Sequence, residues 1–239
     1  MLVDILHLIL RSFGMGKYMK KMVVVTGGTS GLGLELTKLF SQAGYSVLVL
    51  ARTQKEELGN VMYEYGSIAD ESFVKRVYEK YSKHYCIEYL INNAACGSFG
   101  TPETNTLEKI NSVLEAGLVG LILNTTYALP LLDPSGAKII NVLSTAALRG
   151  NVNESLYCAQ KWGARGYTES LKATFKGTKI KVVAVSPGGM NTDFWENNRD
   201  YVPKDKSEKW MNAVDVAKVL YDNITNKNLC VSDIVIERV

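Results

Sequence analysis

Short apolar runs alternate with longer amphipathic stretches along the chain from Met22 onward. The runs are rich in β-branched residues, and continuous apolar strands of this kind are typical of a parallel sheet that is buried on both faces. The expected strands are Met22–Thr26, Val47–Ala51, Val61–Tyr65, Ile87–Asn92, Lys138–Leu143, Lys181–Ser186 and Val231–Ile236.

Between these runs, apolar positions recur every three to four residues, which predicts helices. Regular alternation of strands and helices favours right-handed crossovers and a doubly wound sheet. We therefore predict an α/β fold of about seven parallel strands with helices on both faces, in three αβα layers. We see no internal repeat and no Pro/Ser-rich linker, so residues 22–239 are expected to form one domain. The expected helices are Leu32–Ala43, Glu71–Lys83, Thr106–Leu131, Leu156–Phe175 and Ala213–Thr225.

Residues 1–21 do not follow this alternation. Asp4 and His7 break their apolar run, and neither a basic leading region nor a signal-peptidase site is present. One alternative is a mis-assigned start, with the true first residue at Met15, Met19 or Met22. The other is a short amphipathic helix that docks on the body of the protein or on a membrane surface.

Composition excludes several classes of protein. The chain has 239 residues, of which 46% are hydrophobic and 21% charged, as in ordinary globular domains. Its net charge is +3 and no basic run is longer than Lys20–Lys21, which argues against nucleic-acid binding. The four cysteines have no metal-site spacing, which favours a reduced, cytoplasmic protein without a bound metal. No uncharged apolar stretch reaches ~18 residues, so no membrane span is expected.

A glycine-rich turn, Thr26-Gly-Gly-Thr-Ser-Gly-Leu-Gly33, joins the first strand to the first helix. Gly27 permits the tight turn, Gly31 lets a pyrophosphate approach the backbone, and Gly33 lets the helix pack closely. The free amides at the helix N-terminus can then hold phosphate. The turn predicts a dinucleotide site formed by Gly27, Thr29, Ser30, Gly31, Leu32 and Gly33.

The residue after the second strand bears on the choice of cofactor. Many NAD-binding sheets carry an acid there for the ribose 2′-hydroxyl, whereas this chain has Arg52. An arginine can pair with a 2′-phosphate through two hydrogen bonds. The sequence therefore favours NADP(H) over NAD(H), the alternative being that Arg52 is a solvated loop residue.

A second candidate site combines Ser144, Tyr157 and Lys161. Tyr157 and Lys161 are four residues apart in a predicted helix and share one face. An ammonium group beside a phenol favours the phenolate, so we expect the pKa of Tyr157 to be lowered and the residue to act as a general acid/base. Ser144 ends a predicted strand at the sheet edge where ligands bind in such folds.

These residues resemble the short-chain dehydrogenase/reductase family in its compact single-domain form, over roughly residues 22–239. The resemblance rests on five motifs in the family's order. They are Thr26–Gly33 for TGxxxGxG, Asn92-Asn93-Ala94-Ala95 for NNAG, Ser144, Tyr157 with Lys161, and Pro187–Thr192 for PGxxxT.

The resemblance implies a Rossmann-like fold and a set of residue roles. Ser144 would position a carbonyl, Tyr157 would transfer a proton, and Lys161 would hold the ribose hydroxyls and tune the tyrosine. Thr192 would contact the nicotinamide carboxamide. The cofactor residues outside the glycine turn would be Arg52, Asn93, Ala94, Tyr157, Lys161, Pro187, Gly188 and Thr192.

Three positions depart from the family pattern. The family's relay asparagine falls at Gly117, its adenine-binding aspartate falls at Gly66 or Ser67, and NNAG reads NNAA. We expect Gly117→Asn to be tolerated, because a water could fill the space beside the glycine. The alternative is that Gly117 makes room for the substrate or for a neighbour such as Tyr127.

The predicted function is reversible hydride transfer between a carbonyl and an alcohol, with a CH–OH donor and NAD(P) as acceptor. The alternative is an NADP(H)-binding sensor or scaffold with weak or no catalysis because of Gly117. A homodimer or homotetramer is expected, because the helices Thr106–Leu131 and Leu156–Phe175 carry more apolar residues than one buried face needs. The expected substrate is a small carbonyl compound with an apolar body, under a short lid at about 193–211. The expected substrate residues are Ser144, Ala146, Tyr157, Gly189, Phe194 and Trp195, with Phe99 and Leu148 near them.

Overall fold

The computed structural model describes residues 19–54, 58–198 and 200–239. Both interpretations of the N-terminal segment concern residues that lie almost wholly outside this range. Strand β1 starts at Lys20, two residues before its expected start.

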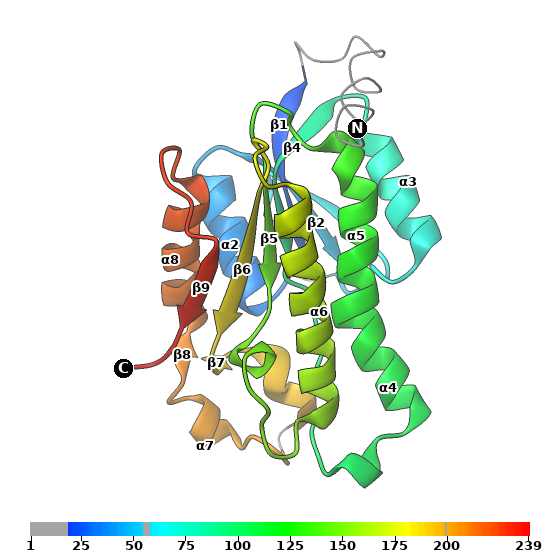
Figure 1. Cartoon of the computed structure of the whole chain (residues 1–239), viewed down its shortest axis with the longest axis vertical. Coiled ribbons are helices and arrows are strands. Elements are labelled where there is room, and N and C mark those ends of the chain that lie inside the picture. The colour runs from blue at the N-terminus through cyan, green and yellow to red at the C-terminus, as the bar shows by residue number, and fades with distance from the viewer. Residues whose placement is uncertain (1–18, 55–57, 199) are drawn as a thin grey trace.

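The centre of the molecule is one parallel sheet of seven strands, as the sequence predicted (Figure 1). Its order is β3-β2-β1-β4-β5-β6-β9, so the chain crosses from one half of the sheet to the other between β3 and β4. The strands are β1 (Lys20–Thr26), β2 (Ser46–Ala51), β3 (Val61–Tyr65), β4 (Tyr85–Asn92), β5 (Lys138–Val142), β6 (Lys181–Pro187) and β9 (Asp233–Ile236).

Helices cover both faces of the sheet and complete the three layers. Helices α2 and α8 pack on one face, and α3, α5 and α6 on the other. The helices are α2 (Gly31–Gln42), α3 (Glu71–Tyr81), α4 (Leu107–Leu114), α5 (Gly120–Ala128), α6 (Ser155–Thr174), α7 (Lys204–Ser207) and α8 (Ala213–Thr225).

The alternation of side chains along β1 shows why its apolar run is continuous. Met22 and Val24 pack in the cluster under α3 and α6, whereas Val23 and Val25 pack in the cluster under α2 and α8. All four side chains are fully buried. Successive side chains of a strand point to opposite faces, so a strand with helices on both faces needs an apolar residue at every position.

The long helix expected at Thr106–Leu131 is divided. A π-helical segment, Glu115–Val119, separates α4 from α5, and a 3-10 turn follows at Leu129–Leu131. Within the described residues, this stretch is the helix that is long and apolar enough to span a membrane, judged by length and composition only. Glu108, Lys109 and Glu115 lie within it, so it contains no uncharged apolar stretch of ~18 residues. In the fold, it lies against α3 and α6.

The segment between β6 and α8 contains short elements that the sequence did not predict. The two-residue strands β7 (Met190–Asn191) and β8 (Met211–Asn212) pair with each other, and the 3-10 turn Asp193–Asn198 and α7 lie between them. Elements this short carry too little periodicity to be recognised from sequence. They form a cap at the carboxyl ends of the central strands.

Candidate active site

A cavity of about 1080 Å³ lies at the carboxyl ends of the central strands. This is the edge of a doubly wound sheet where ligands bind, and β1 and β4, which flank the crossover, both end there. The cavity brings together nearly all the residues that the sequence singled out. Its wall includes Gly27, Thr29, Ser30, Gly31, Leu32, Arg52, Asn93, Ala94, Ser144, Tyr157, Lys161, Pro187, Gly188, Gly189, Thr192, Phe194 and Trp195.

The glycine turn has the backbone that a phosphate cradle needs. Gly27 and Gly31 have φ angles of 68° and 51°, a region that favours glycine. Gly33, which the sequence placed among the cofactor residues, is not part of the cavity wall. A Cβ there would collide with the Gly27 carbonyl and lie 2.5 Å from the Asn93 amide nitrogen, so Gly33 permits the close approach of helix and turn.

The end of β4 fixes this turn from beside it. The Thr26 hydroxyl accepts hydrogen bonds from the backbone amides of Asn93 and Ala94, at 3.0 and 3.1 Å. The Asn93 side chain donates to the carbonyl oxygens of Thr26 and Gly27. Although Asn93 lines the cavity, its amide group therefore holds the glycine turn. The preceding Asn92 points away and bonds to Thr125 and Asn141.

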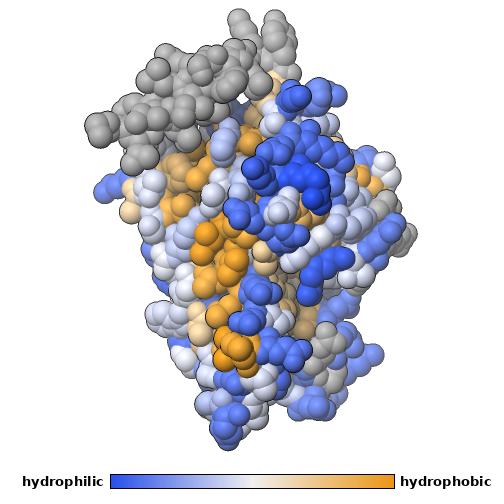
Figure 2. Space-filling model, turned by 90° about the vertical axis from the view of Figure 1, so that its right-hand side faces the viewer, coloured by the Kyte–Doolittle hydropathy of each residue, from blue (hydrophilic) through white to orange (hydrophobic). Residues whose placement is uncertain are grey.

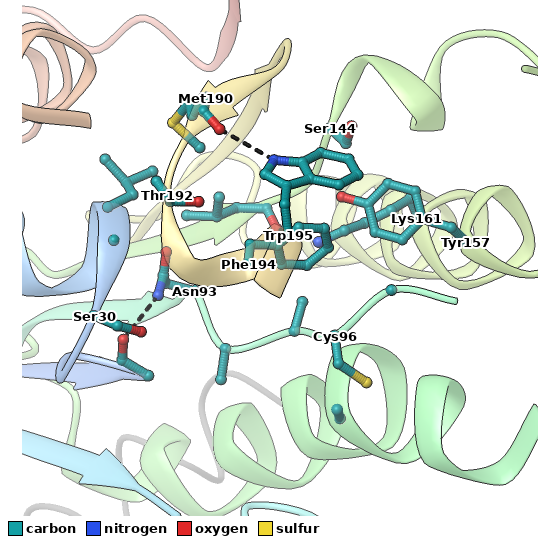
Figure 3. Close-up of a pocket in the computed structure, with 18 of the residues that line it drawn as sticks. Ser30, Asn93, Cys96, Ser144, Tyr157, Lys161, Met190, Thr192, Phe194 and Trp195 are labelled. Carbon is teal, nitrogen blue, oxygen red and sulfur yellow. Dashed lines mark hydrogen bonds between the residues drawn. The ribbon is translucent and has the colours of Figure 1, made fainter. Parts of the chain in front are cut away.

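The cavity wall carries groups suited to a nicotinamide dinucleotide. The hydroxyl of Ser30, the N-cap of α2, makes no capping bond, so it remains available to a phosphate. The exposed Arg52 lies in the wall at the end of β2, beside Gly66 and Ser67. Thr192 lies within 3.3 Å of where a Gly31 side chain would begin, so glycine there keeps the cavity open. Figure 3 shows Ser30, Asn93 and Thr192 at one side and Ser144, Tyr157 and Lys161 at the other.

The three candidate catalytic residues come from two adjoining elements. Ser144 follows β5 and caps a 3-10 turn, where its hydroxyl accepts from the Ala146 amide at 3.1 Å. Tyr157 and Lys161 lie one helical turn apart on α6. The Lys161 ammonium donates to the Val142 carbonyl at 3.1 Å and lies 5.7 Å from the centre of the Tyr157 ring.

Burial determines the electrostatics of this group. It raises the pKa of the Tyr157 hydroxyl, and a hydrogen bond with Ser144 opposes this only in part. The expectation that Lys161 lowers the pKa of Tyr157 is therefore wrong for this state of the protein. Burial also lowers the pKa of Lys161 to about 8, because a charged ammonium is desolvated there.

Aromatic side chains from the cap and from the loop after β4 pack around Tyr157. The centres of the Phe99 and Phe194 rings lie 5.3 and 5.8 Å from that of Tyr157. The Trp195 indole donates to the Met190 carbonyl at 3.1 Å, which fixes the ring above the pocket (Figure 3). Tyr201, which the sequence analysis did not identify, stacks on Phe99 at 4.9 Å. No motif marks Tyr201, because only the folded cap brings it to Phe99.

Three residues expected at or near the substrate, Ala146, Leu148 and Phe99, are not part of the cavity wall. Ala146 is 1% exposed and is not part of the cavity wall, because the 3-10 turn after Ser144 directs it into the core. Leu148 also lies outside the wall. Arg149 and Glu154 line the cavity instead, which the sequence did not suggest.

Gly117 lies within the π-helical segment and faces the side chain of Gln160. A Cβ at position 117 would come no farther than 2.5 Å from the Cδ, Nε2 and Oε1 atoms of Gln160. The expectation of open space for a water is therefore wrong, and so is the choice of Tyr127 as the neighbour that needs the room. Asparagine at 117 would overpack this site, which typically costs 1–3 kcal/mol.

Comparison with known proteins agrees with this geometry. Residues 21–202 match the short chain dehydrogenase family. A 3-oxoacyl-[acyl-carrier-protein] reductase of Rattus norvegicus is 30% identical over 190 residues, which cover 76% of this chain and 80% of that protein. The crystal structure of a short-chain dehydrogenase/reductase from Vibrio parahaemolyticus has a TM-score of 0.79 at 29% identity and covers 91% of this chain and 100% of that one. A serine dehydrogenase complexed with NADP⁺ shares the fold, with a TM-score of 0.81 at 23% identity over 91% and 94% of the two chains.

Proposed function

This chain belongs to the short chain dehydrogenase family, and from this premise we propose that it reduces a ketone or aldehyde with NADPH, or oxidises the matching alcohol with NADP⁺. The observation that carries the proposal is the position of Ser144, Tyr157 and Lys161 in the wall of the cavity that also holds the glycine turn. A single cavity thereby offers a dinucleotide cradle and a proton donor.

The residues have distinct roles in the proposed reduction. A bound nicotinamide dinucleotide supplies the hydride. The Ser144 hydroxyl holds the carbonyl oxygen, and the Tyr157 hydroxyl donates its proton to that oxygen as the alcohol forms. Burial raises the pKa of Tyr157, so its hydroxyl carries the proton through the neutral pH range. Lys161, whose pKa is about 8, can both hold a ribose hydroxyl and exchange a proton near neutral pH.

The aromatic wall indicates the body of the substrate. Phe194 and Trp195 line the cavity, and the Phe194 ring packs against the Tyr157 ring. We infer a carbonyl attached to a compact apolar group that packs against these rings. Small aryl ketones, alkyl ketones and aldehydes are therefore the first compounds to assay.

The proposal is tested by following NADPH oxidation at 340 nm with that panel of carbonyl compounds. We expect turnover of at least one apolar ketone or aldehyde. Tight NADPH binding together with no turnover on any compound would favour the alternative, a cofactor-binding sensor or scaffold.

We expect NADPH to bind at least tenfold more tightly than NADH. Arg52 lies exposed at the end of β2 in the cavity wall, and a charge-assisted contact with a 2′-phosphate contributes about 1.5–3 kcal/mol. Fluorescence titration of both cofactors measures the ratio. Arg52→Ala should bring it close to one, whereas Arg149→Ala, which changes another arginine of the same wall, should leave it unaltered. Equal affinities in the unmodified protein would contradict the assignment.

We also propose that the protein is a homodimer or a homotetramer. Val119 and Trp162, on the neighbouring helical elements Glu115–Val119 and α6, are 40% and 51% exposed. Figure 2 shows hydrophobic residues gathered in a stripe along the side of the molecule formed by these helices. A stripe of this kind on two parallel helices suits a second copy related by a two-fold axis. Light scattering should give a mass of at least twice 26.4 kDa for the unmodified protein. Trp162→Glu should give the mass of a monomer. A monomeric mass for the unmodified protein would contradict the proposal.

A further inference from the structure

Gln160 directly precedes Lys161 in α6, and its side chain is fully buried. Its amide nitrogen donates to the Cys96 carbonyl at 3.2 Å and also to the Val113 carbonyl. Two acceptors on one side fix the orientation of the amide, because an oxygen turned toward them would be repelled. The other atom, Oε1, is buried and has no donor among the described residues. The proposed reaction assigns no role to this side chain.

The two carbonyls belong to separate parts of the site. Cys96 follows β4 and lines the cavity, whereas Val113 lies in the last turn of α4 before the π-helical segment. The Cys96 thiol donates to the Ser112 carbonyl at 3.3 Å, in the same turn. A π-helical segment widens the helix and is often found at functional sites. Here the turn that leads into it is held by side chains from α6 and from the end of β4.

Gly117 provides the space for this arrangement. The carboxamide of Gln160 lies against its Cα, in the volume where any side chain at 117 would begin. A glycine within a helix costs about 1 kcal/mol relative to alanine, and fixing a glutamine side chain costs further conformational entropy. The two residues therefore form one unit, in which an amide carried by α6 fills a gap in the neighbouring helix.

We propose that Gln160 is a positioning residue for Tyr157 and Lys161. Its carboxamide ties α6 to the widened turn after α4 and to Cys96, on the helix that carries the reacting pair. Among the described residues, the Lys161 ammonium donates one hydrogen bond, to the Val142 carbonyl, so the position of Lys161 in the cavity depends on how α6 packs. A displacement of about 1 Å at a reacting group can cost 10²-fold in rate. This inference rests on the proposed function, because the pair that Gln160 positions is the proton-transfer pair.

The test compares Gln160→Ala, Gly117→Asn and the double variant. We expect each single change to lower kcat at least tenfold, the first by freeing α6 and the second by displacing the Gln160 amide. The KM for the carbonyl substrate should change less than threefold, because neither residue lines the cavity. In the double variant the new amide at position 117 can enter the vacated volume, so kcat should return to within threefold of the starting value. Gln42→Ala, at an exposed glutamine that ends α2, is the matched control.

A kcat unchanged in Gln160→Ala, or a double variant no better than Gln160→Ala, would overturn the proposal. A parallel readout needs no turnover: the nicotinamide fluorescence of bound NADPH should fall in each single variant and recover in the double one. If the unmodified protein reduces no compound, the proposed function fails. The fluorescence of the four proteins still decides whether Gln160 and Gly117 act as one unit at this site, since additive losses would refute it.

Discussion

Tyr157→Phe is expected to lower carbonyl turnover roughly 10²–10⁴-fold and to change NADPH affinity less than twofold. The substitution removes only the hydroxyl that donates the proton, and general acid catalysis contributes about this much to rate. The ring remains, so its packing against Phe99 and Phe194 is preserved. Steady-state kinetics with the preferred substrate and fluorescence titration of NADPH measure the two quantities.

Tyr167→Phe is the matched control. Tyr167 lies three turns along the same helix, and its hydroxyl bonds to the side chains of Thr125 and Thr126, outside the cavity wall. Its loss should leave turnover within twofold. If Tyr157→Phe retained most of its activity, Tyr157 would not be the proton donor, and the assignment of the site would fail.

Lys161→Met is expected to have opposite effects on activity and on stability. Lys161 is 3% exposed, and burial lowers its pKa from 10.5 to about 8 in the folded protein. Each pKa unit corresponds to about 1.4 kcal/mol, so keeping this ammonium charged in the fold costs about 3 kcal/mol. The lost hydrogen bond to Val142 offsets about 1 kcal/mol. At pH 7 the free energy of unfolding of the variant should therefore be about 2 kcal/mol larger, and its melting temperature several degrees higher. The variant should also lose turnover.

The pH dependence of this difference follows from the same shift. Below pH 8, Lys161 is charged in both the folded and the unfolded state, so the full cost is present. Between pH 8 and 10.5 only the unfolded state binds the proton, so the stability of the unmodified protein rises relative to that of the variant. The gain from Lys161→Met should therefore shrink as pH rises through this window. Lys176→Met, at an exposed lysine just after α6, should change stability by less than about 0.5 kcal/mol at every pH. A less stable Lys161→Met at pH 7 would contradict the burial argument.

The sequence by itself determined the class of fold and the location of the site. A strand with helices on both faces must be apolar at every position, so continuous apolar runs such as Met22–Thr26 could be predicted as strands from the sequence. The glycine turn could also be recognised from the sequence, because positive φ angles at Gly27 and Gly31 favour glycine at those positions. Since the carboxyl ends of parallel strands meet at one edge, Ser144 and the glycine turn had to be neighbours.

Only the tertiary structure decided what lies between these motifs. Gly33 belongs to the glycine turn and Ala146 was expected to contact the substrate, yet neither lies in the cavity wall. Burial raises the pKa of Tyr157, and one of the rings packed against it, Phe194, comes from a cap with no sequence signature. Gly117 appeared from the sequence to have lost a side chain, whereas in the fold an amide from another helix occupies that volume. Periodicity and motifs report contacts along one element. Which side chain fills a space between two elements is decided only when the helices pack together, as with Gln160 beside Gly117.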